Sequence, residues 1–184
     1  MPATKKRVLA ICGSTRANSS NFQIVKAIAK LAKDDQDIEI YNGRDWLPHF
    51  NPDLDNENVS ANVTEFKDQL IAADRFLICA PEYVFSLTGS LKNAIEWTVS
   101  ATIFSNKPVA FITASSPEEK TYESLKLIFK TINARFDDRC QLLITGVKTK
   151  VNDHGEITDD LTLKKSNELI GASIKNNEWR ISLK

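Results

Sequence analysis

Residues 8–21, VLAICGSTRANSSN, decide the fold of this chain. They begin with the apolar run Val8–Cys12, continue through a loop rich in hydroxyl and amide side chains, and lead into a segment of helical periodicity. A short continuous apolar run is typical of a strand that is buried on both faces of a parallel sheet. The stretch therefore predicts a buried strand, a loop beyond the end of that strand, and a helix, which together start an α/β unit.

The loop between this strand and this helix, Gly13–Asn21, has the composition of a phosphate site. It carries several hydroxyls, the guanidinium of Arg16 and the backbone N–H groups of a helix start, all of which attract anions. It lacks the Gly-Lys-Ser/Thr ending of a P-loop and the GxGxxG pattern of a dinucleotide site. The alternative is an ordinary helix cap, with Ser20 or Asn21 as the capping residue.

The rest of the chain repeats the alternation of strand and helix. We expect further strands at 38–41, 76–80, 108–113 and 141–145, and helices at 21–33, 63–73, 90–101, 122–136 and 161–175. This pattern predicts a single α/β domain over residues 1–184, with a three-layer, doubly wound, five-stranded parallel sheet in the flavodoxin-like strand order 2-1-3-4-5. Such a sheet binds ligands beyond the carboxyl ends of its strands, so the loops after Cys12, Ala80 and Thr113 are the expected site.

Composition excludes several classes of function. The 24 basic and 24 acidic side chains cancel, so no overall field draws the chain to nucleic acid or to an anionic membrane. The apolar run near the N-terminus is about five residues long, shorter than a signal peptide requires, and no stretch is long enough for a membrane span. We therefore expect a cytoplasmic protein. Cys12, Cys79 and Cys140 are widely spaced, and we expect buried, reduced thiols and no metal site, with a redox or metal role as the alternative.

A second loop follows the third predicted strand, within residues 80–97, APEYVFSLTGSLKNAIEW. Pro81 ends the strand, and a rigid Pro-Glu-Tyr turn can offer backbone donors and one wall to a flat ring. Gly89 is expected to let the chain turn closely into the next helix. The sequence thus places a ring-binding loop beside the phosphate loop.

With both loops in view, the chain resembles the NADPH-dependent FMN reductase family, a flavodoxin-fold group that includes quinone, chromate and azo reductases. The motif PEYxxSxxGxLKNAIEW is complete over residues 81–97, and residues 45–52, DWLPHFNP, are similar to the family's Leu-Pro loop. The motif GSxRxxSxN is present as Gly13, Ser14, Arg16, Ser19 and Asn21.

The resemblance implies an enzyme that transfers hydride from NADPH or NADH through bound FMN to a quinone-like acceptor, another small electrophile or free flavin. No catalytic side chain is expected, because the flavin carries the chemistry. The resemblance also implies a homodimer or homotetramer with small-molecule partners. The expected cofactor-binding residues are Ser14, Arg16, Ser19, Ser20, Asn21, Pro81, Glu82, Tyr83, Val84, Ser86, Ser115 and Ser116.

Several of these side chains have a second interpretation. Glu82 and Lys92 either approach the ligands or brace the loop as charged groups. Trp97 is expected in the core or at a subunit interface, and His49 and His154 are expected at the surface. These residues therefore need the tertiary structure before a role is assigned to them.

Two other functions stay open. The first is a flavodoxin-type one-electron carrier, although Arg16 and the zero net charge weigh against it. The second is a flavin-free relative of this fold that binds another phosphorylated ligand. Ser115 and Ser116 stand where the family commonly has a glycine-rich turn, so we expect the pyridine nucleotide to fit differently here.

Overall fold

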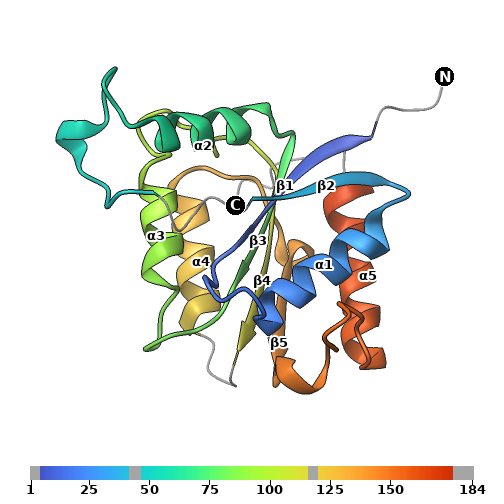
Figure 1. Cartoon of the computed structure of the whole chain (residues 1–184). Coiled ribbons are helices and arrows are strands. Elements are labelled where there is room, and N and C mark those ends of the chain that lie inside the picture. Colours follow the sequence, from blue (N-terminus) through green and yellow to red (C-terminus); the bar gives the residue numbers. More distant parts are fainter. Residues whose placement is uncertain (1–4, 42–46, 116–119, 176–184) are drawn as a thin grey trace.

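In the computed structural model, the described part of the chain (residues 5–41, 47–115 and 120–175) contains one five-stranded sheet (Figure 1). All neighbouring strands are parallel, and their order is β2-β1-β3-β4-β5. The strands are β1 (Lys6–Cys12), β2 (Gln36–Tyr41), β3 (Arg75–Ala80), β4 (Val109–Ser115) and β5 (Gln141–Thr145). The predicted sheet and its order are confirmed.

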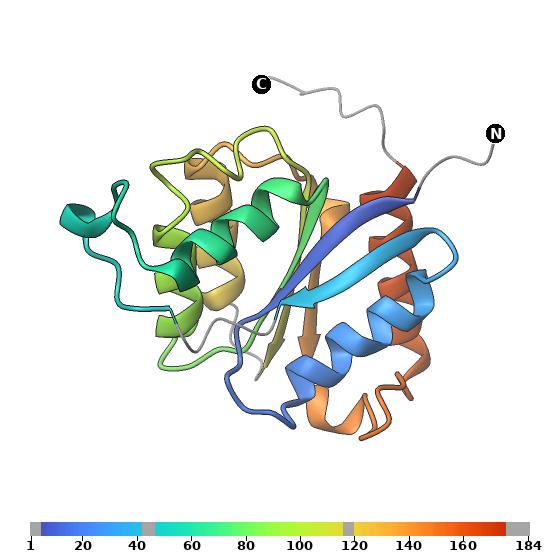
Figure 2. The same cartoon turned by 45° about the horizontal axis from the view of Figure 1, so that its top comes forward.

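Helices cover both faces of this sheet and complete three layers (Figures 1 and 2). Two helices pack on one face and three on the other, and each face has its own apolar core. The pair is α1 (Ser20–Ala32) and α5 (Asp160–Lys175), and the three are α2 (Ala61–Ala72), α3 (Gly89–Glu96) and α4 (Lys120–Thr131). In β1, Leu9 and Ile11 face the three-helix side while Val8 and Ala10 face the other, because side chains alternate along a strand.

The position of a strand in the sheet explains its burial. Every residue of the central strand β3 is buried, as expected for a strand with helices on both faces. Strand β2 alternates between exposed and partly buried positions and lies at one edge, as its sequence predicted. Cys12 pairs with Cys79, and Ala80 pairs with Thr113, so the ends of β1, β3 and β4 lie side by side.

Two details of the helices differ from the sequence prediction. Helix α1 is capped by Ser19, whose hydroxyl accepts a hydrogen bond of 3.1 Å from the N–H of Phe22, and not by Ser20 or Asn21. Ile71 of α2 is 59% exposed, although its helical spacing from Val63, Phe66 and Leu70 predicts that it faces inward with them. Only Val63, Phe66 and Leu70 of α2 are buried, because they lie along the line where the helix contacts the sheet.

Helices α3 and α4 are shorter than predicted. Helix α3 ends at Glu96, after which the chain continues as turns. Helix α4 ends at Thr131, and Asn133 just beyond it adopts the left-handed conformation, with φ 58°. A left-handed residue after the last turn is a common way to stop a helix, and asparagine tolerates it better than most residues.

An excursion of residues 47–59, which includes η2 (Pro52–Leu54), protrudes beside α2 and α3 (Figure 1). Asn93 of α3 and Trp97, which directly follows α3, hold the excursion in place at Pro48. Asn93 donates to the Pro48 carbonyl at 2.9 Å and accepts from the N–H of Phe50 at 2.7 Å. The indole N–H of Trp97 donates to the same carbonyl at 2.8 Å. Trp97 is 1% exposed and belongs to the core, as expected.

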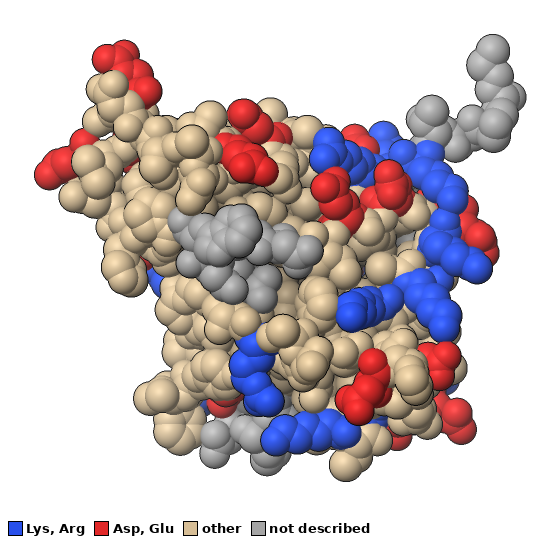
Figure 3. Space-filling model, in the orientation of Figure 1, with Lys and Arg blue, Asp and Glu red and all other residues tan. Residues whose placement is uncertain are grey.

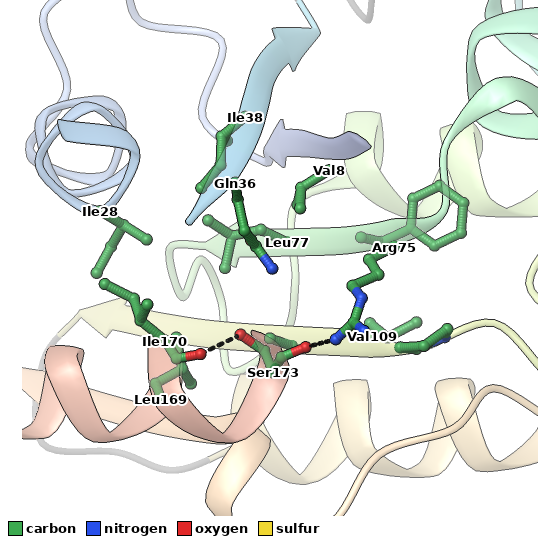
Figure 4. A pocket seen from close by; sticks show the side chains of 13 residues that line it. Val8, Ile28, Gln36, Ile38, Arg75, Leu77, Val109, Leu169, Ile170 and Ser173 are labelled. Atoms are coloured by element: carbon green, nitrogen blue, oxygen red, sulfur yellow. Dashed lines mark hydrogen bonds between the residues drawn. The ribbon is translucent and has the colours of Figure 1, made fainter. Parts of the chain in front are cut away.

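The amino ends of the strands enclose a small cavity beneath α5 (Figure 4). Its volume is about 20 Å³, which is the scale of one water molecule and far below that of a cofactor site. The buried Arg75 donates to the carbonyl oxygen of Ser173 near the end of α5, and burial lowers the pKa of its guanidinium. Arg75 thus ties β3 to α5, and this cavity is too small to hold a cofactor.

The described residues also lack two other kinds of feature. No helix among them is long and apolar enough to cross a lipid bilayer. Within the same ranges, no cluster of three or more His, Cys, Asp or Glu side chains could hold a metal ion.

Candidate functional site

A hollow opens at the carboxyl ends of β1, β3 and β4, where the sequence predicted the site. Its volume accessible to water is about 440 Å³, within the usual range of ligand sites. It unites the predicted residues of the first loop with those of the Pro-Glu-Tyr turn and adds residues that follow β5. The lining residues are Ser14, Arg16, Ser19, Ser20, Asn21, Pro81, Glu82, Tyr83, Ala114, Gly146, Val147, Lys148 and Thr149.

The first loop and the second loop are joined at Gly13. Its N–H donates to the carbonyl of Cys79 at 2.7 Å, and its own carbonyl accepts from the Thr88 hydroxyl at 2.7 Å. A Cβ atom at Gly13 would lie 3.1 Å from a methyl group of Leu91 and 3.3 Å from the Thr88 hydroxyl. The close approach needs glycine here, whereas a Cβ at Gly89 would meet nothing within 4 Å, contrary to our expectation.

The start of α1 supplies the anion-attracting part of the hollow. Ser19 uses its hydroxyl to cap the helix, while Ser20 and Asn21 form the first turn, where backbone N–H groups carry partial positive charge. Arg16 is exposed on the preceding loop and lines the same hollow. The first loop thus brings several hydrogen-bond donors and one cation to the hollow. It contains no Asp or Glu that would repel an anion.

Asn21 lines the hollow, yet its side chain is engaged inside the protein. Its amide donates to the carbonyl of Ala114 at 3.0 Å, and its oxygen lies 3.4 Å from the thiol of Cys79. These contacts join the start of α1 to the ends of β4 and β3. The side chain of Asn21 therefore positions the helix. Its backbone is the part of the residue that is left to bind a ligand in the hollow.

Glu82 lines the hollow and also braces it. One carboxylate oxygen accepts a 2.8 Å hydrogen bond from the N–H of Thr121 in the first turn of α4, where a negative charge is favourable. Lys92 lies outside the lining set and forms an ion pair with Glu96 on the exposed side of α3. The contact of Glu82 ties the second loop to α4, whereas the ion pair of Lys92 stays within α3.

Lys148 and Thr149 were missed by the sequence analysis. They lie in η4 (Val147–Thr149), which follows β5 and packs against the start of α1. Gly146 precedes them in the left-handed conformation, with φ 63°. The sequence signal was weak, because a glycine and a lysine after a strand match no phosphate-binding pattern. Lys148 adds a second cation to the hollow.

Residues Tyr83–Ser86 form a tight turn at the rim. The N–H of Tyr83 donates to the Ser86 carbonyl at 2.9 Å, and the N–H of Ser86 donates to the Tyr83 carbonyl at 3.1 Å. Val84 and Phe85 both have positive φ, 53° and 57°, which costs a non-glycine residue about 1–2 kcal/mol. Val84 is 94% exposed, and neither Val84 nor Ser86 lines the hollow.

Two predicted site residues fall at the limit of the described ranges. Ser115 ends β4, but its side chain is not described, and Ser116 lies outside the described residues. The expected wall after β4 is therefore represented here only by Ala114.

Comparison with known proteins gives a consistent result. The family model for NADPH-dependent FMN reductase matches residues 6–146. The chain is 29% identical over 169 residues to an NAD(P)H-dependent FMN reductase of Pseudomonas aeruginosa, covering 89% of each. It is 29% identical over 168 residues to an NAD(P)H:quinone oxidoreductase of Solanum tuberosum, covering 86% of each.

The fold is also similar to that of a solved flavoenzyme. FerB, an NAD(P)H:(acceptor) oxidoreductase from Paracoccus denitrificans, superposes with a TM-score of 0.75 at 26% identity. The superposition covers 92% of this chain and 96% of FerB.

Proposed function

This chain belongs to the NADPH-dependent FMN reductase family, and we propose that it binds FMN in the hollow at the carboxyl ends of β1, β3 and β4. Its activity is flavin-dependent oxidation of NAD(P)H. The two loops and the segment after β5 hold the cofactor, and a small molecule receives the electrons.

The donor set of the hollow fits the phosphate of FMN. A phosphate monoester carries nearly two negative charges at neutral pH and accepts several hydrogen bonds. Arg16 and Lys148 supply positive charge, Ser20 supplies a hydroxyl, and the first turn of α1 supplies N–H groups. The one carboxylate in the lining, Glu82, is held by a backbone N–H of α4.

The second loop fits the flavin ring. Pro81 and Tyr83 line the hollow, and Pro81 keeps this segment from continuing as a strand. The observation that carries the proposal is the pair of hydrogen bonds at Gly13, because they fix this ring-binding segment beside the phosphate loop. FMN held there would supply the hydride-transfer chemistry, and the first loop with Pro81 and Tyr83 would bind and orient it.

The acceptor that we propose is a quinone-like or other small electrophilic molecule, or free flavin. Two of the relatives are named as an FMN reductase and a quinone oxidoreductase, which are activities of this kind. Either pyridine nucleotide can serve as donor under this proposal.

The test begins with the purified protein and FMN. We expect a yellow complex of one FMN per chain that is bleached anaerobically by NADPH or NADH and recoloured by menadione. Steady NADPH consumption with menadione, without a partner reductase, separates the enzyme from a flavodoxin-type carrier. Failure to take up FMN would instead favour a relative that binds another phosphorylated ligand.

We further propose one cooperative domain that assembles as a homodimer or homotetramer in the cytoplasm. Exposed apolar side chains on the excursion and after α3, such as Leu54 at 54% and Val99 at 50%, support the assembly. Light scattering after size exclusion tests the oligomer, calorimetry tests for a single transition, and cell fractionation tests the location. A monomer in light scattering would contradict the proposed oligomer, and two unfolding transitions would contradict the single cooperative domain.

A further inference from the structure

The 83–86 turn presents three consecutive apolar or aromatic side chains to solvent. Tyr83 is 51% exposed, Val84 94% and Phe85 64%, and Tyr83 also lines the hollow. The β3–α3 loop that contains this turn lies at the lower left of Figure 1, and Figure 3 shows that corner as mainly uncharged surface. An apolar strip thus begins inside the hollow and continues outward from its rim.

The backbone of this turn has a left-handed conformation at Val84 and Phe85, which these residue types disfavour. Two central residues with positive φ define the tight turn for which Asn-Gly is the favoured sequence. A β-branched valine and a bulky phenylalanine are among the least suited residues. Packing does not explain them, because their side chains are largely exposed. Strain that neither local preference nor packing explains is characteristic of functional sites.

The charges of the hollow divide it into two parts. The lining cations, Arg16 and Lys148, belong to the first loop and to the segment after β5, whereas the 83–86 turn follows β3. The cationic partners of a phosphate-bearing ligand therefore come from segments of the chain other than the turn. A flat ligand without charge has its complementary surface on the turn itself.

We propose that Val84 and Phe85 form a contact surface for the electron acceptor, and that Phe85 selects uncharged aromatic acceptors over charged ones. The inference rests on the proposed function. The reaction balances as NADPH, one proton and a quinone giving NADP⁺ and a hydroquinone, with two electrons passing through the flavin. A second copy of the chain is the less favoured occupant, since one turn offers far less than the roughly 800 Å² per partner of a stable interface.

The experiment separates the two half-reactions of the FMN-loaded protein. Enzyme is reduced anaerobically with NADPH, or with dithionite in a parallel series, and is mixed in a stopped-flow instrument with menadione or with ferricyanide. The variants are Phe85→Ala, which removes the ring, and Phe85→Gly, which removes the ring and also suits a positive φ. Leu127→Ala is the matched control, because Leu127 is as exposed as Phe85, 66% against 64%, but belongs to α4 and not to the turn at the rim.

In both Phe85 variants we expect the second-order rate of reoxidation by menadione to fall about 3- to 10-fold, the scale of one aromatic contact. Reoxidation by ferricyanide and reduction by NADPH stay unchanged, as do all rates of Leu127→Ala. Phe85→Gly raises the midpoint of thermal unfolding above that of Phe85→Ala, which separates backbone strain from the effect of the ring.

Three results would overturn the inference. The first is an unchanged menadione rate in Phe85→Ala, and the second is an equal loss with ferricyanide, which would mean a general distortion of the site. The third is a change of oligomeric state in Phe85→Ala, which would assign the turn to a subunit interface. If NADPH fails to reduce the wild-type protein, the proposed function fails, and the dithionite series still measures the role of Phe85.

Discussion

The hydroxyl of Thr88 donates a 2.7 Å hydrogen bond to the carbonyl oxygen of Gly13, across 75 residues of sequence. The hydroxyl oxygen of Thr88 also accepts a hydrogen bond from the N–H of Leu91 at 3.4 Å and so caps α3. One buried side chain therefore holds both the start of α3 and the first loop. This contact makes the two loops of the proposed FMN site one unit.

Replacing Thr88 by valine removes this hydroxyl while keeping the shape of the side chain. We expect the unfolding free energy of the FMN-free protein to fall by about 1–2 kcal/mol, because α3 loses its cap and the Gly13 carbonyl keeps only the longer hydrogen bond from the Ser90 hydroxyl, at 3.4 Å. FMN affinity should fall as well, because the loops lose their fixed spacing. Urea unfolding and fluorescence titration with FMN measure the two effects. Thr88→Ser keeps the hydroxyl and should stay near wild type, and equal losses in both variants would contradict the explanation.

Gly13→Ala tests the close approach of the loops directly. The added methyl would press on Leu91, which is fully buried, and on Thr88, and neither can withdraw freely. We expect a loss of about 1–3 kcal/mol of stability, as for overpacking of a core, together with weaker FMN binding. Gly89→Ala is the control, because its Cβ meets nothing within 4 Å. A Gly13→Ala protein as stable as Gly89→Ala would remove the steric argument.

The two cations of the hollow are tested by comparing FMN with riboflavin, which lacks the phosphate. Arg16→Ala should weaken FMN binding by roughly 1.5–3 kcal/mol, the scale of a charge-assisted hydrogen bond. Lys148→Ala should weaken it by about 1 kcal/mol, since an exposed lysine is screened by water. Riboflavin affinity should not change in either variant. Lys150→Ala is the control outside the hollow, and an equal effect there would show only a general charge effect.

The ion pair between Asp55 and Lys67 predicts a loss of stability in acid. Burial raises the pKa of Asp55, but hydrogen bonds from Lys67 and Ser100 and the charge of Lys67 outweigh it, so the pKa lies below its usual value. The stabilisation is therefore present above the unfolded pKa, about 3.9, and is lost as the pH falls through the folded pKa. Urea unfolding measures the free energy of unfolding at pH 6 and at pH 2.5. The fall in this free energy between the two pH values should be smaller in Asp55→Asn than in wild type. Asp53→Asn, an exposed carboxyl of the same excursion, should keep the wild-type drop.

The three cysteines should be silent in the folded protein. All are buried thiols outside any disulfide, and burial raises the pKa of Cys79 well above its ordinary value and that of Cys140 to about 11. The reactive thiolate is therefore scarce and inaccessible near neutral pH. With Ellman's reagent at pH 8 we expect no rapid reaction in buffer and release from three thiols in urea. One rapidly reacting thiol in the native protein would reopen a redox role.

Much of this architecture could be predicted because its signals are local. The apolar run before Gly13 identified a buried strand, and the hydroxyl-rich segment after it identified a loop and a helix start. Polar and apolar residues alternate in 38–41, which is typical of a strand near a sheet edge, and β2 lies at the edge. Errors arose where neighbouring residues were equally suited, as at the α1 cap, where Ser19 and not Ser20 takes the role.

Other features depend on contacts between distant segments. Nothing in the sequence near Lys148 indicated the hollow, because only the packing of η4 against α1 brings it there. Asn93 and Trp97 belong to the motif of the second loop, yet the structure engages both with Pro48 of the excursion. The strain at Val84 and Phe85 was also hidden, because residue type alone predicts the opposite conformation.

The sequence by itself determined the alternation of strands and helices, the family and the two loops of the proposed site, because periodicity, turn residues and motifs act over a few neighbouring positions. The tertiary structure alone decided which side chains brace the site, which face the hollow, and that the segment after β5 joins it. These choices depend on the order of strands in the sheet and on helix packing, which bring together residues such as Gly13 and Thr88 that no local pattern relates.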